Sequence, residues 1–342
     1  MSGVSEGTVD RVLHNRGGVS PKSREAINKI LEDINYSPNI LARSLASKKQ
    51  YTFIAMMPEF RQGEYWHSIS EGFDVASNDF KQYHVDIQKH FFNQYDSASF
   101  NALADEIIEL HPNAVCIAPI FREETIAFTQ KLSVNEIPFS YIDSMIEETD
   151  FLSYYGQHSF QSGYVGAKVL FESLPSNAEI IVIRTKRKGA VSNQTDKRHK
   201  GFIQFMQDND LYNKTKLISF EIKNDEEDKN INALQTIFVQ NSNIKAVITF
   251  NSKIYKIAHY LEKIGKKELH VIGYDLLDEN VKLLKEGVVS ALIAQRPEKQ
   301  AYNSIHNLCK KLIFNQKITQ INYVPIDILM KENIDYYLQY QE

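Results

Sequence analysis

The sequence is poor in cysteine and lacks a long apolar run. Only two of its 342 residues are cysteine, Cys116 and Cys309, and both lie in apolar surroundings. A disulfide framework is therefore not expected, and a reducing cytoplasm fits this usage. No stretch of about 18 apolar residues occurs, so we expect no membrane-spanning helix and no membrane partner. The N-terminus is too polar for a signal peptide.

The sequence also lacks the common catalytic motifs. Its ten histidines show no metal-ligand spacing such as HExxH. There is no Walker loop, no GxGxxG after the first predicted strand, and no GxSxG elbow joining a strand to a helix. Asp143 and Asp275 could be drawn as a carboxylate pair of the glycosidase type, but the binding of hydroxyl groups explains them more simply. We therefore expect a binding protein that is not an enzyme and has no cofactor and no metal.

The first fifty residues contain three helix-start signals. Ser5 is placed to cap a helix that runs roughly from Glu6 to His14 and ends at the glycines 17–18. Ser20-Pro21 opens a second helix with a serine cap and a proline at the first helical position. Ser37-Pro38 repeats this pattern before a short third segment, 39–45. Such a small helical module has little room for a pocket, so it is expected to bind rather than to transform.

Charge separates this module from the rest of the chain. Residues 1–50 carry eight Lys and Arg against five Asp and Glu, a net charge of +3. Because the whole chain carries −4, the remainder carries −7. A basic head on an acidic body indicates a nucleic-acid contact that is confined to one end of the chain.

Three motifs in this module, 4–13, 19–22 and 36–45, closely resemble the headpiece of lactose-repressor-type (LacI family) transcription regulators in order and spacing. The resemblance implies that Glu6 to Leu13 is the recognition helix of a helix-turn-helix, which enters the major groove of double-stranded DNA. It also implies that the segment 38–46 is a hinge helix, with Leu45 as an apolar wedge in the minor groove.

The resemblance assigns DNA-binding roles to individual residues. Arg11 would form a bidentate contact to guanine, and Glu6 and Gly7 occupy the other base-reading positions. Thr8, Ser20, Lys22 and Arg24 would anchor phosphates, which fixes the protein on DNA without specifying sequence. The family's first helix would lie upstream of Met1, so the headpiece is expected to be truncated. The DNA-binding set is Ser5, Glu6, Gly7, Thr8, Arg11, Ser20, Lys22, Arg24 and Leu45.

After a polar link at 46–50, short apolar strands alternate with helices of ten to fifteen residues. Among them are the predicted strands 84–89, 139–142 and 217–221 and the predicted helix 65–80. This alternation predicts βαβ units and parallel sheets, that is, an α/β fold. The pattern starts again near residue 159, which indicates two similar lobes. The second part resembles the sugar-binding core of the same family, akin to periplasmic binding proteins. The resemblance implies a headpiece at 1–50 and a core at 51–342, with crossings between the lobes near Gln157, Arg296 and Lys317. The first lobe would comprise about 51–157 and 297–316, and the second about 158–296 and 317–342.

Ends of the predicted strands and family positions mark a ligand cleft between the lobes. Aromatic residues follow the first strand, and the carboxylate, amide and guanidinium groups suit an uncharged, polyhydroxylated molecule. Many relatives carry arginine after the first aspartate, where this chain has Ser144. Tyr65 could equally be an aromatic buried at a helix start. The expected effector-binding set is Phe60, Tyr65, Trp66, Asp143, Ser144, Arg198, Asn251, Asp275 and Gln295.

Together these observations predict a transcription regulator that binds a pseudo-palindromic DNA operator as a homodimer and senses a sugar or sugar-like molecule. The alternative is a sugar-binding sensor whose headpiece no longer binds DNA. Whether the effector releases DNA or promotes its binding is open at this point.

Overall fold

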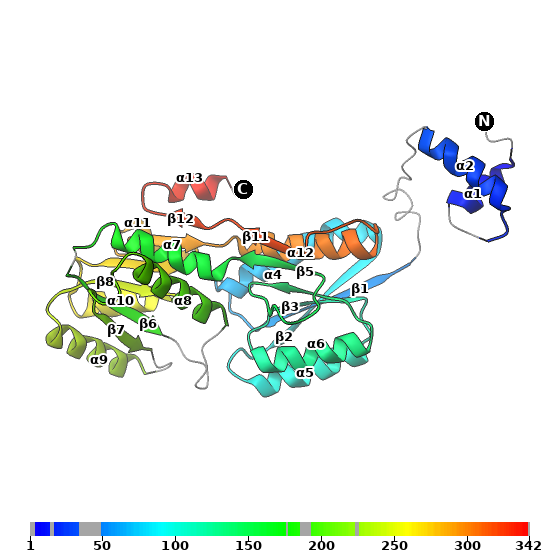
Figure 1. The fold of residues 1–342 in the computed structure, drawn as a ribbon. Coiled ribbons are helices and arrows are strands. Elements are labelled where there is room, and N and C mark those ends of the chain that lie inside the picture. The colour runs from blue at the N-terminus through cyan, green and yellow to red at the C-terminus, as the bar shows by residue number, and fades with distance from the viewer. Residues whose placement is uncertain are drawn as a thin grey trace. The chain divides into compact units, whose positions relative to one another are not determined.

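The computed structural model describes residues 4–13, 17–33, 49–175, 177–184, 193–222 and 226–340. The chain divides into two compact units, Met1–Lys49 and Gln50–Glu342. Figure 1 shows the helices and strands of both units.

The N-terminal unit contains two packed helices, α1 (Glu6–Leu13) and α2 (Pro21–Asp33). Both start at the predicted serines. The Thr8 amide donates to Ser5 Oγ at 3.3 Å, and the Ser23 amide donates to Ser20 Oγ at 3.1 Å. Because each cap satisfies an N–H group that the helix itself leaves unpaired, the caps fix where the helices begin. The predicted segment 39–45, with Leu45, lies outside the described residues.

The core unit is built on two six-stranded sheets with matching strand orders, β11-β5-β4-β3-β1-β2 and β12-β10-β9-β8-β6-β7. Figure 1 shows the sheets as two successive lobes. The strands of the first lobe are β1 (Tyr51–Pro58), β2 (Val85–Phe92), β3 (Ala114–Ile117), β4 (Phe139–Ile142), β5 (Ser153–Gln157) and β11 (Ile321–Val324). Those of the second lobe are β6 (Glu179–Arg184), β7 (Leu217–Glu221), β8 (Ile244–Thr249), β9 (His270–Tyr274), β10 (Ala291–Ala294) and β12 (Asp327–Leu329).

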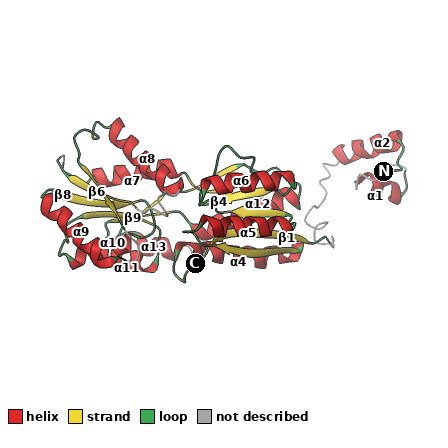
Figure 2. Ribbon diagram, turned by 90° about the horizontal axis from the view of Figure 1, so that it is seen from below, coloured by secondary structure: helices red, strands yellow, loops and turns green. Residues whose placement is uncertain are grey.

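Helices cover both faces of each sheet, as expected for parallel sheets joined by crossover helices (Figure 2). In the first lobe α4 (Tyr65–Phe80) packs with α12 (Pro297–Leu312), and α5 (Ser97–Glu109) packs with α6 (Arg122–Val134). In the second lobe α7 (Ser159–Phe171) packs with α8 (Asn193–Asp208). The remaining helices are η1 (Lys81–Tyr83), α9 (Glu227–Gln240), α10 (Ile254–Lys263), α11 (Asp278–Lys285) and α13 (Ile334–Gln339).

The prediction of an α/β fold with two parallel-sheet lobes is confirmed, with one exception. Strand β12 pairs antiparallel with β10. The other strands run toward the cleft between the lobes. β12 follows β11 directly and enters its sheet from the cleft side, so it runs the opposite way.

The chain crosses between the lobes at three places. The first crossing follows Gln157 at the end of β5, and the second contains Arg296 between β10 and α12. The third lies between β11 and β12, at Pro325 and Ile326, and not near Lys317 as predicted. The boundary shifts because the segment 321–324 adds a parallel strand to the first sheet beside β5 before the chain crosses.

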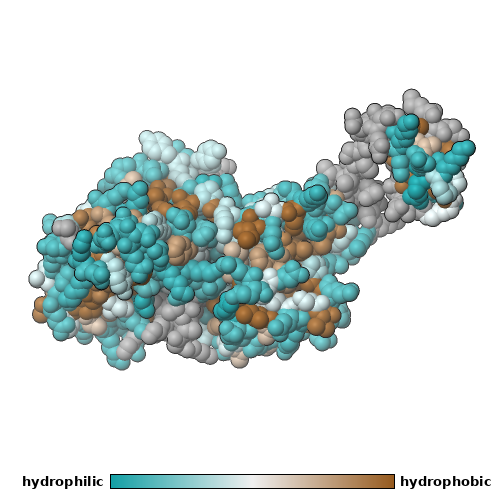
Figure 3. Space-filling view, viewed as in Figure 1, coloured by the Kyte–Doolittle hydropathy of each residue, from teal (hydrophilic) through white to brown (hydrophobic). Residues whose placement is uncertain are grey.

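Most apolar side chains are buried between the sheets and the helices. They form separate clusters, which pack on the faces of the two sheets. On the face shown in Figure 3, hydrophilic residues predominate and apolar residues reach the surface in separate patches. Within the described ranges, no helix combines the length and the apolar character that a membrane crossing requires.

Candidate functional site

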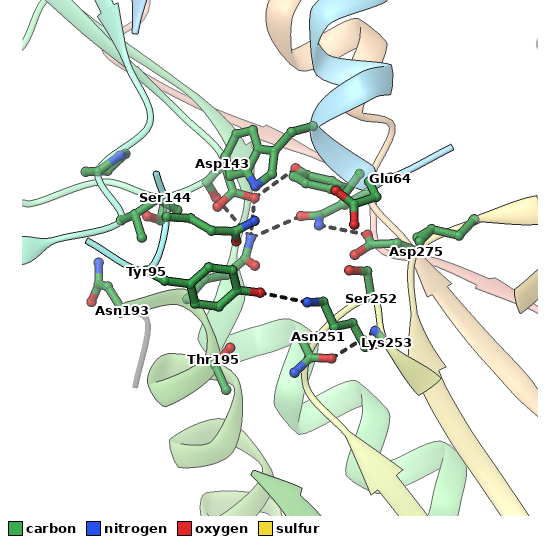
Figure 4. A pocket seen from close by; sticks show the side chains of 18 of the residues that line it. Glu64, Tyr95, Asp143, Ser144, Asn193, Thr195, Asn251, Ser252, Lys253 and Asp275 are labelled. Carbon is green, nitrogen blue, oxygen red and sulfur yellow. Dashed lines mark hydrogen bonds between the residues drawn. The ribbon is translucent and has the colours of Figure 1, made fainter. Parts of the chain in front are cut away.

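A pocket lies between the two lobes of the core unit, at the carboxyl ends of the strands. The segments that follow β2, β4, β8, β9 and β10 all contribute to it, which is the usual ligand position in parallel sheets. Figure 4 shows these side chains converging. The pocket is lined by Glu64, Tyr65, Trp66, Gln94, Tyr95, Pro119, Ile120, Asp143, Ser144, Asn193, Gln194, Thr195, Asn251, Ser252, Lys253, Tyr255, Asp275, Leu277 and Gln295.

The structure brings most of the predicted effector-binding residues together in this lining: Tyr65, Trp66, Asp143, Ser144, Asn251, Asp275 and Gln295. Two others do not line it. The Phe60 ring packs beside those of His67 and Phe91, at centroid distances of 5.7 and 5.5 Å. Arg198 is completely buried behind the pocket wall. Contact between any of these residues and a ligand stays a prediction.

Asp275 anchors the second-lobe side of the pocket. Its Oδ1 atom accepts a hydrogen bond of 2.8 Å from Gln295 Nε2. Arg198 Nη2 in turn donates to Gln295 Oε1 at 3.1 Å, so Gln295 lies between a cation and a carboxyl group. Burial raises the pKa of the Asp275 carboxyl to about 6, although Arg198 and Gln295 act to lower it. A buried carboxyl group with a perturbed pKa, placed in a cleft, is typical of a functional site.

Arg198 is held in place by contacts within its own lobe. Its Nη1 atom donates to the Phe250 carbonyl at 3.0 Å, and its guanidinium carbon lies 4.0 Å from the centroid of the Tyr274 ring. These contacts fix the guanidinium where it supports Gln295 from outside the pocket. Cation–π contacts of this kind gain strength when the charge is desolvated.

Asp143 anchors the first-lobe side. Its Oδ1 atom accepts hydrogen bonds from the Tyr65 hydroxyl at 2.8 Å and from Gln194 Nε2 at 2.7 Å. Burial and the nearby charges of Asp143 and Asp275 raise the pKa of Tyr65 well above its ordinary value. Tyr65 therefore stays protonated and acts as a hydrogen-bond donor at neutral pH.

Hydrogen bonds cross the cleft from donors in the second lobe to acceptors in the first. Three donors lie in the first turns of α8. Gln194 donates to Asp143, and Asn193 Nδ2 donates to the Met145 carbonyl at 3.1 Å. Lys197 Nζ donates to a Glu147 carboxylate oxygen at 2.9 Å. Lys253 is a further donor from the second lobe. The lobes are therefore joined by polar contacts at the same place where a ligand would lie.

Lys253 and Tyr95 form a bridge on another side of the pocket. Lys253 Nζ donates to the Tyr95 hydroxyl at 2.9 Å, as the dashed line in Figure 4 shows. The Lys253 amide donates to Asn251 Oδ1 at 2.9 Å, which ties the start of α10 to the end of β8. The bridge therefore connects the rigid end of a strand in one lobe to the loop after β2 in the other.

The position of α8, and with it Gln194 and Arg198, depends on close packing against α7. A Cβ atom at Gly163 would lie 1.8 Å from the Arg198 carbonyl oxygen, and one at Gly201 would lie 1.8 Å from the Phe160 carbonyl oxygen. Glycine is required at both positions because any side chain would push the two helices apart. The helices contact each other through their backbones here.

Several pocket residues were not predicted from the sequence. Gln94 and Tyr95 follow β2, whose end was predicted at Lys89 but lies at Phe92. A longer strand prediction would have identified them as strand-end residues. Gln194 carries no comparable signal, because it lies in the first turn of a helix and reaches Asp143 only through the arrangement of the lobes. The others are Glu64, Pro119, Ile120, Asn193, Thr195, Ser252, Lys253, Tyr255 and Leu277.

The pocket is suited to binding hydroxyl groups. Carboxylates and amides supply acceptors and donors, and the Trp66 and Tyr65 rings, 5.1 Å apart between centroids, supply apolar surface. The charged side chains of the lining are Glu64, Asp143, Asp275 and Lys253, which gives the described walls more carboxylates than cations. No group of three or more His, Cys, Asp or Glu side chains arranged to hold a metal occurs among the described residues.

The N-terminal unit presents a second candidate site. Glu6, Gly7, Arg11 and Lys22 are exposed, whereas Val12 is buried, with 8% of its surface accessible. The predicted base-reading residues and the buried Val12 therefore lie on different faces of α1. The Arg11 guanidinium lies beside Gly18, whose φ of +81° is readily accessible to glycine. The hydroxyls of Ser5 and Thr8 are 2.9 Å apart and hydrogen-bonded.

Comparisons with known proteins give matches for both parts of the chain. The model of the periplasmic binding protein domain matches residues 54–316, and that of bacterial regulatory proteins of the lacI family matches residues 1–39. A solved structure from Bacteroides fragilis, assigned as a LacI transcriptional regulator, is 40% identical, with a TM-score of 0.80 over 84% of this chain and 100% of that chain. This chain belongs to the LacI family.

Other similarities are more limited. Catabolite control protein A of Staphylococcus xylosus, a curated protein, is 33% identical over 82 residues, which cover 24% of this chain and 25% of that protein. A periplasmic solute-binding protein of an ABC transporter from Actinobacillus succinogenes 130z, solved with bound D-allose, is 20% identical. It has a TM-score of 0.71 over 84% of this chain and 100% of that chain, which shows a shared fold.

Proposed function

We propose that this protein is a bacterial, cytoplasmic transcription regulator that binds operator DNA and responds to a neutral sugar or sugar-like molecule. The observation that carries the proposal is the presence, in one chain, of a lacI-type headpiece at 1–39 and a binding-protein core at 54–316. In this proposal the cleft and the headpiece both bind, and neither catalyses a reaction.

The nature of the pocket supports the choice of ligand. Its polar groups are mainly carboxylates, amides and hydroxyls, and carboxylates outnumber cations in the described lining. A phosphorylated or acidic sugar would meet electrostatic repulsion from Asp143 and Asp275, whereas neutral hydroxyl groups can donate hydrogen bonds to these carboxylates. The solute-binding protein that shares this fold was solved with D-allose, a neutral monosaccharide.

The exposed residues of α1 support the choice of DNA as partner. Arg11 and Glu6 lie on the exposed side of a helix whose buried side contacts the rest of the unit. A single short helix reads only a few base pairs, so a pair of headpieces from a homodimer would read the two halves of a pseudo-palindromic operator. A ligand that binds one arrangement of the lobes more tightly than the other would then shift the affinity for DNA.

Selection of bound sequences from a random pool of double-stranded DNA tests the DNA-binding part of the proposal. The full chain and a version extended upstream are compared at a fixed moderate salt concentration, because phosphate contacts make affinity strongly dependent on salt. A palindromic motif recovered by either version is expected. If neither version selects a motif although the core is folded, the DNA-free sugar sensor becomes the better interpretation.

Calorimetric titration tests the ligand part independently. The panel consists of D-allose, other neutral monosaccharides and polyols, and the corresponding sugar phosphates and sugar acids. Binding of a neutral member with rejection of its phosphorylated counterpart is expected. Tighter binding of the phosphorylated compounds would contradict the proposed ligand class.

A further inference from the structure

The side chain of Gln157 links all three crossings between the lobes. Gln157 is the last residue of β5 and begins the first crossing, and it is 1% exposed. Its Nε2 atom donates to the Ala294 carbonyl at 2.9 Å, at the end of β10 where the second crossing begins. The same atom donates to the Pro325 carbonyl at 3.2 Å, inside the third crossing. One amide group therefore joins three segments that are far apart in the sequence.

The chemistry of the site requires an amide nitrogen at this position. Both neighbours are carbonyl oxygens, which only accept hydrogen bonds, and an amide nitrogen carries one hydrogen for each. The other end of the group, Gln157 Oε1, is buried without a hydrogen-bond partner among the described residues. A buried acceptor without a partner is unfavourable, and local conflicts of this kind are expected at functional or strained positions.

Neighbouring hydrogen bonds hold the crossing segments in place around Gln157. The Tyr154 hydroxyl donates to the Gln157 carbonyl at 3.0 Å. Arg296, in the second crossing, pairs through Nε and Nη2 with both carboxylate oxygens of Asp327, just after the third crossing, at 2.7 and 3.0 Å. Arg296 also has a left-handed backbone, with φ of 50°. Bending between lobes is absorbed by backbone rotation at a few such residues.

We propose that Gln157 is a positioning residue of the hinge. Its amide spans points on both sides of the bending residues, so a change of angle between the lobes must lengthen at least one of its two hydrogen bonds. The amide thereby limits the lobes to a narrow range of angles. This role concerns the movement of the fold itself and holds whichever molecule the cleft binds.

The proposal is tested by measuring the distance between two spin labels with pulsed electron paramagnetic resonance. The labels are attached at Glu123→Cys on α6 of the first lobe and Val239→Cys on α9 of the second. Both native side chains are strongly exposed, at 85% and 82%. Both native cysteines are buried, so labelling is directed to the introduced cysteines. The chain that carries only the two native cysteines is the control for background labelling.

In this labelled chain, Gln157→Met removes both hydrogen bonds while keeping a side chain of similar length. We expect the distribution of distances between the lobes to broaden or shift relative to the chain with Gln157. Gln157→Asn keeps the amide but is too short to reach both carbonyls, so an intermediate effect is expected. The shorter amide also serves as the test if the methionine variant does not fold.

Asn322→Leu is the matched control. Asn322 Nδ2 also donates to two carbonyls, those of Tyr154 and Thr319, at 3.1 and 2.9 Å, but both lie on the first-lobe side of the crossings. Its loss is expected to lower stability in urea without changing the distance distribution. An unchanged distribution in the folded Gln157 variants would overturn the proposal. An equal broadening in Asn322→Leu would also overturn it, because the effect would then be general loosening.

Discussion

Asp143 and Asp275 occupy equivalent positions in the two lobes. Asp143 follows β4 and Asp275 follows β9, and each of these strands is third in the order of its sheet. Both have a left-handed backbone, with φ of 67° and 69°. Their amides donate to equivalent neighbouring strands, at Tyr155 of β5 and Ile293 of β10. The left-handed conformation is costly for most residues, and such backbone strain concentrates at ligand sites.

We expect Asp275→Ala to weaken ligand binding strongly without unfolding the core. A hydrogen bond to a charged group contributes about 1.5–3 kcal/mol, so its loss weakens binding by roughly 10- to 100-fold. Calorimetry with a sugar that binds the unsubstituted chain measures the loss, and circular dichroism checks the fold. Unchanged affinity would show that the ligand lies elsewhere.

We expect Asp275→Asn to stabilise the ligand-free protein at pH 8 and to have little effect near pH 4. The folded-state pKa of about 6 exceeds the ordinary value of 3.8. The stability associated with the protonated form is therefore complete below about pH 3.8 and is lost as the pH rises through about 6. The shift corresponds to about 3 kcal/mol of unfolding free energy. Urea unfolding at several pH values measures it, and a difference independent of pH would contradict the prediction.

We expect Lys253→Met and Tyr95→Phe to weaken ligand binding by similar amounts. Each removes one partner of the 2.9 Å hydrogen bond that connects the lobes. A net value of about 0.5–1.5 kcal/mol for such a bond corresponds to roughly a 2- to 10-fold loss for each change. The double variant should lose little more than either single variant. Fully additive losses, measured by calorimetry, would show that the two residues act separately.

We expect Arg11→Ala and Lys22→Ala to affect DNA binding differently. Arg11 is predicted to contact a guanine, so its loss should relax base preference at one operator position, at a cost of about 1–3 kcal/mol. Lys22 is predicted to contact a phosphate, so its loss should weaken binding to all sequences about equally. Sequence selection with each variant measures the difference. Equal effects on sequence preference would refute the assignment of Arg11 to base reading.

Much of the fold could be predicted because most elements have clear periodicity and clear ends. The helix Tyr65–Phe80 and the strands Phe139–Ile142 and Leu217–Glu221 have the predicted bounds. Strand β5 was not predicted, since Ser153–Gln157 is polar and contains a glycine although most of it is buried. A Cβ atom at Gly156 would lie 2.2 Å from the Tyr154 hydroxyl, so the glycine belongs to this tightly packed strand. Strands β11 and β12 are short and were also missed.

The pocket could be predicted where it depends on strand ends. Asp143, Asn251, Asp275 and Gln295 each follow a strand, and parallel strands bring such residues to one edge. Gln194 and Lys253 could not be predicted in the same way, because their contacts depend on how the two lobes face each other. The sequence also placed Arg198 in contact with the ligand, whereas the structure shows its guanidinium directed at Gln295 from behind.

The glycine contacts between α7 and α8 have a mechanical consequence. Helix α7 starts directly after the first crossing, and its backbone at Gly163 lies against that of Arg198 in α8. Because no side chain separates the two backbones at this contact, the helix pair is expected to move as one rigid body. A small rotation at residue 158 therefore moves Gln194 together with α7, and a ligand that contacts Gln194 acts on the same helix pair that starts at the hinge.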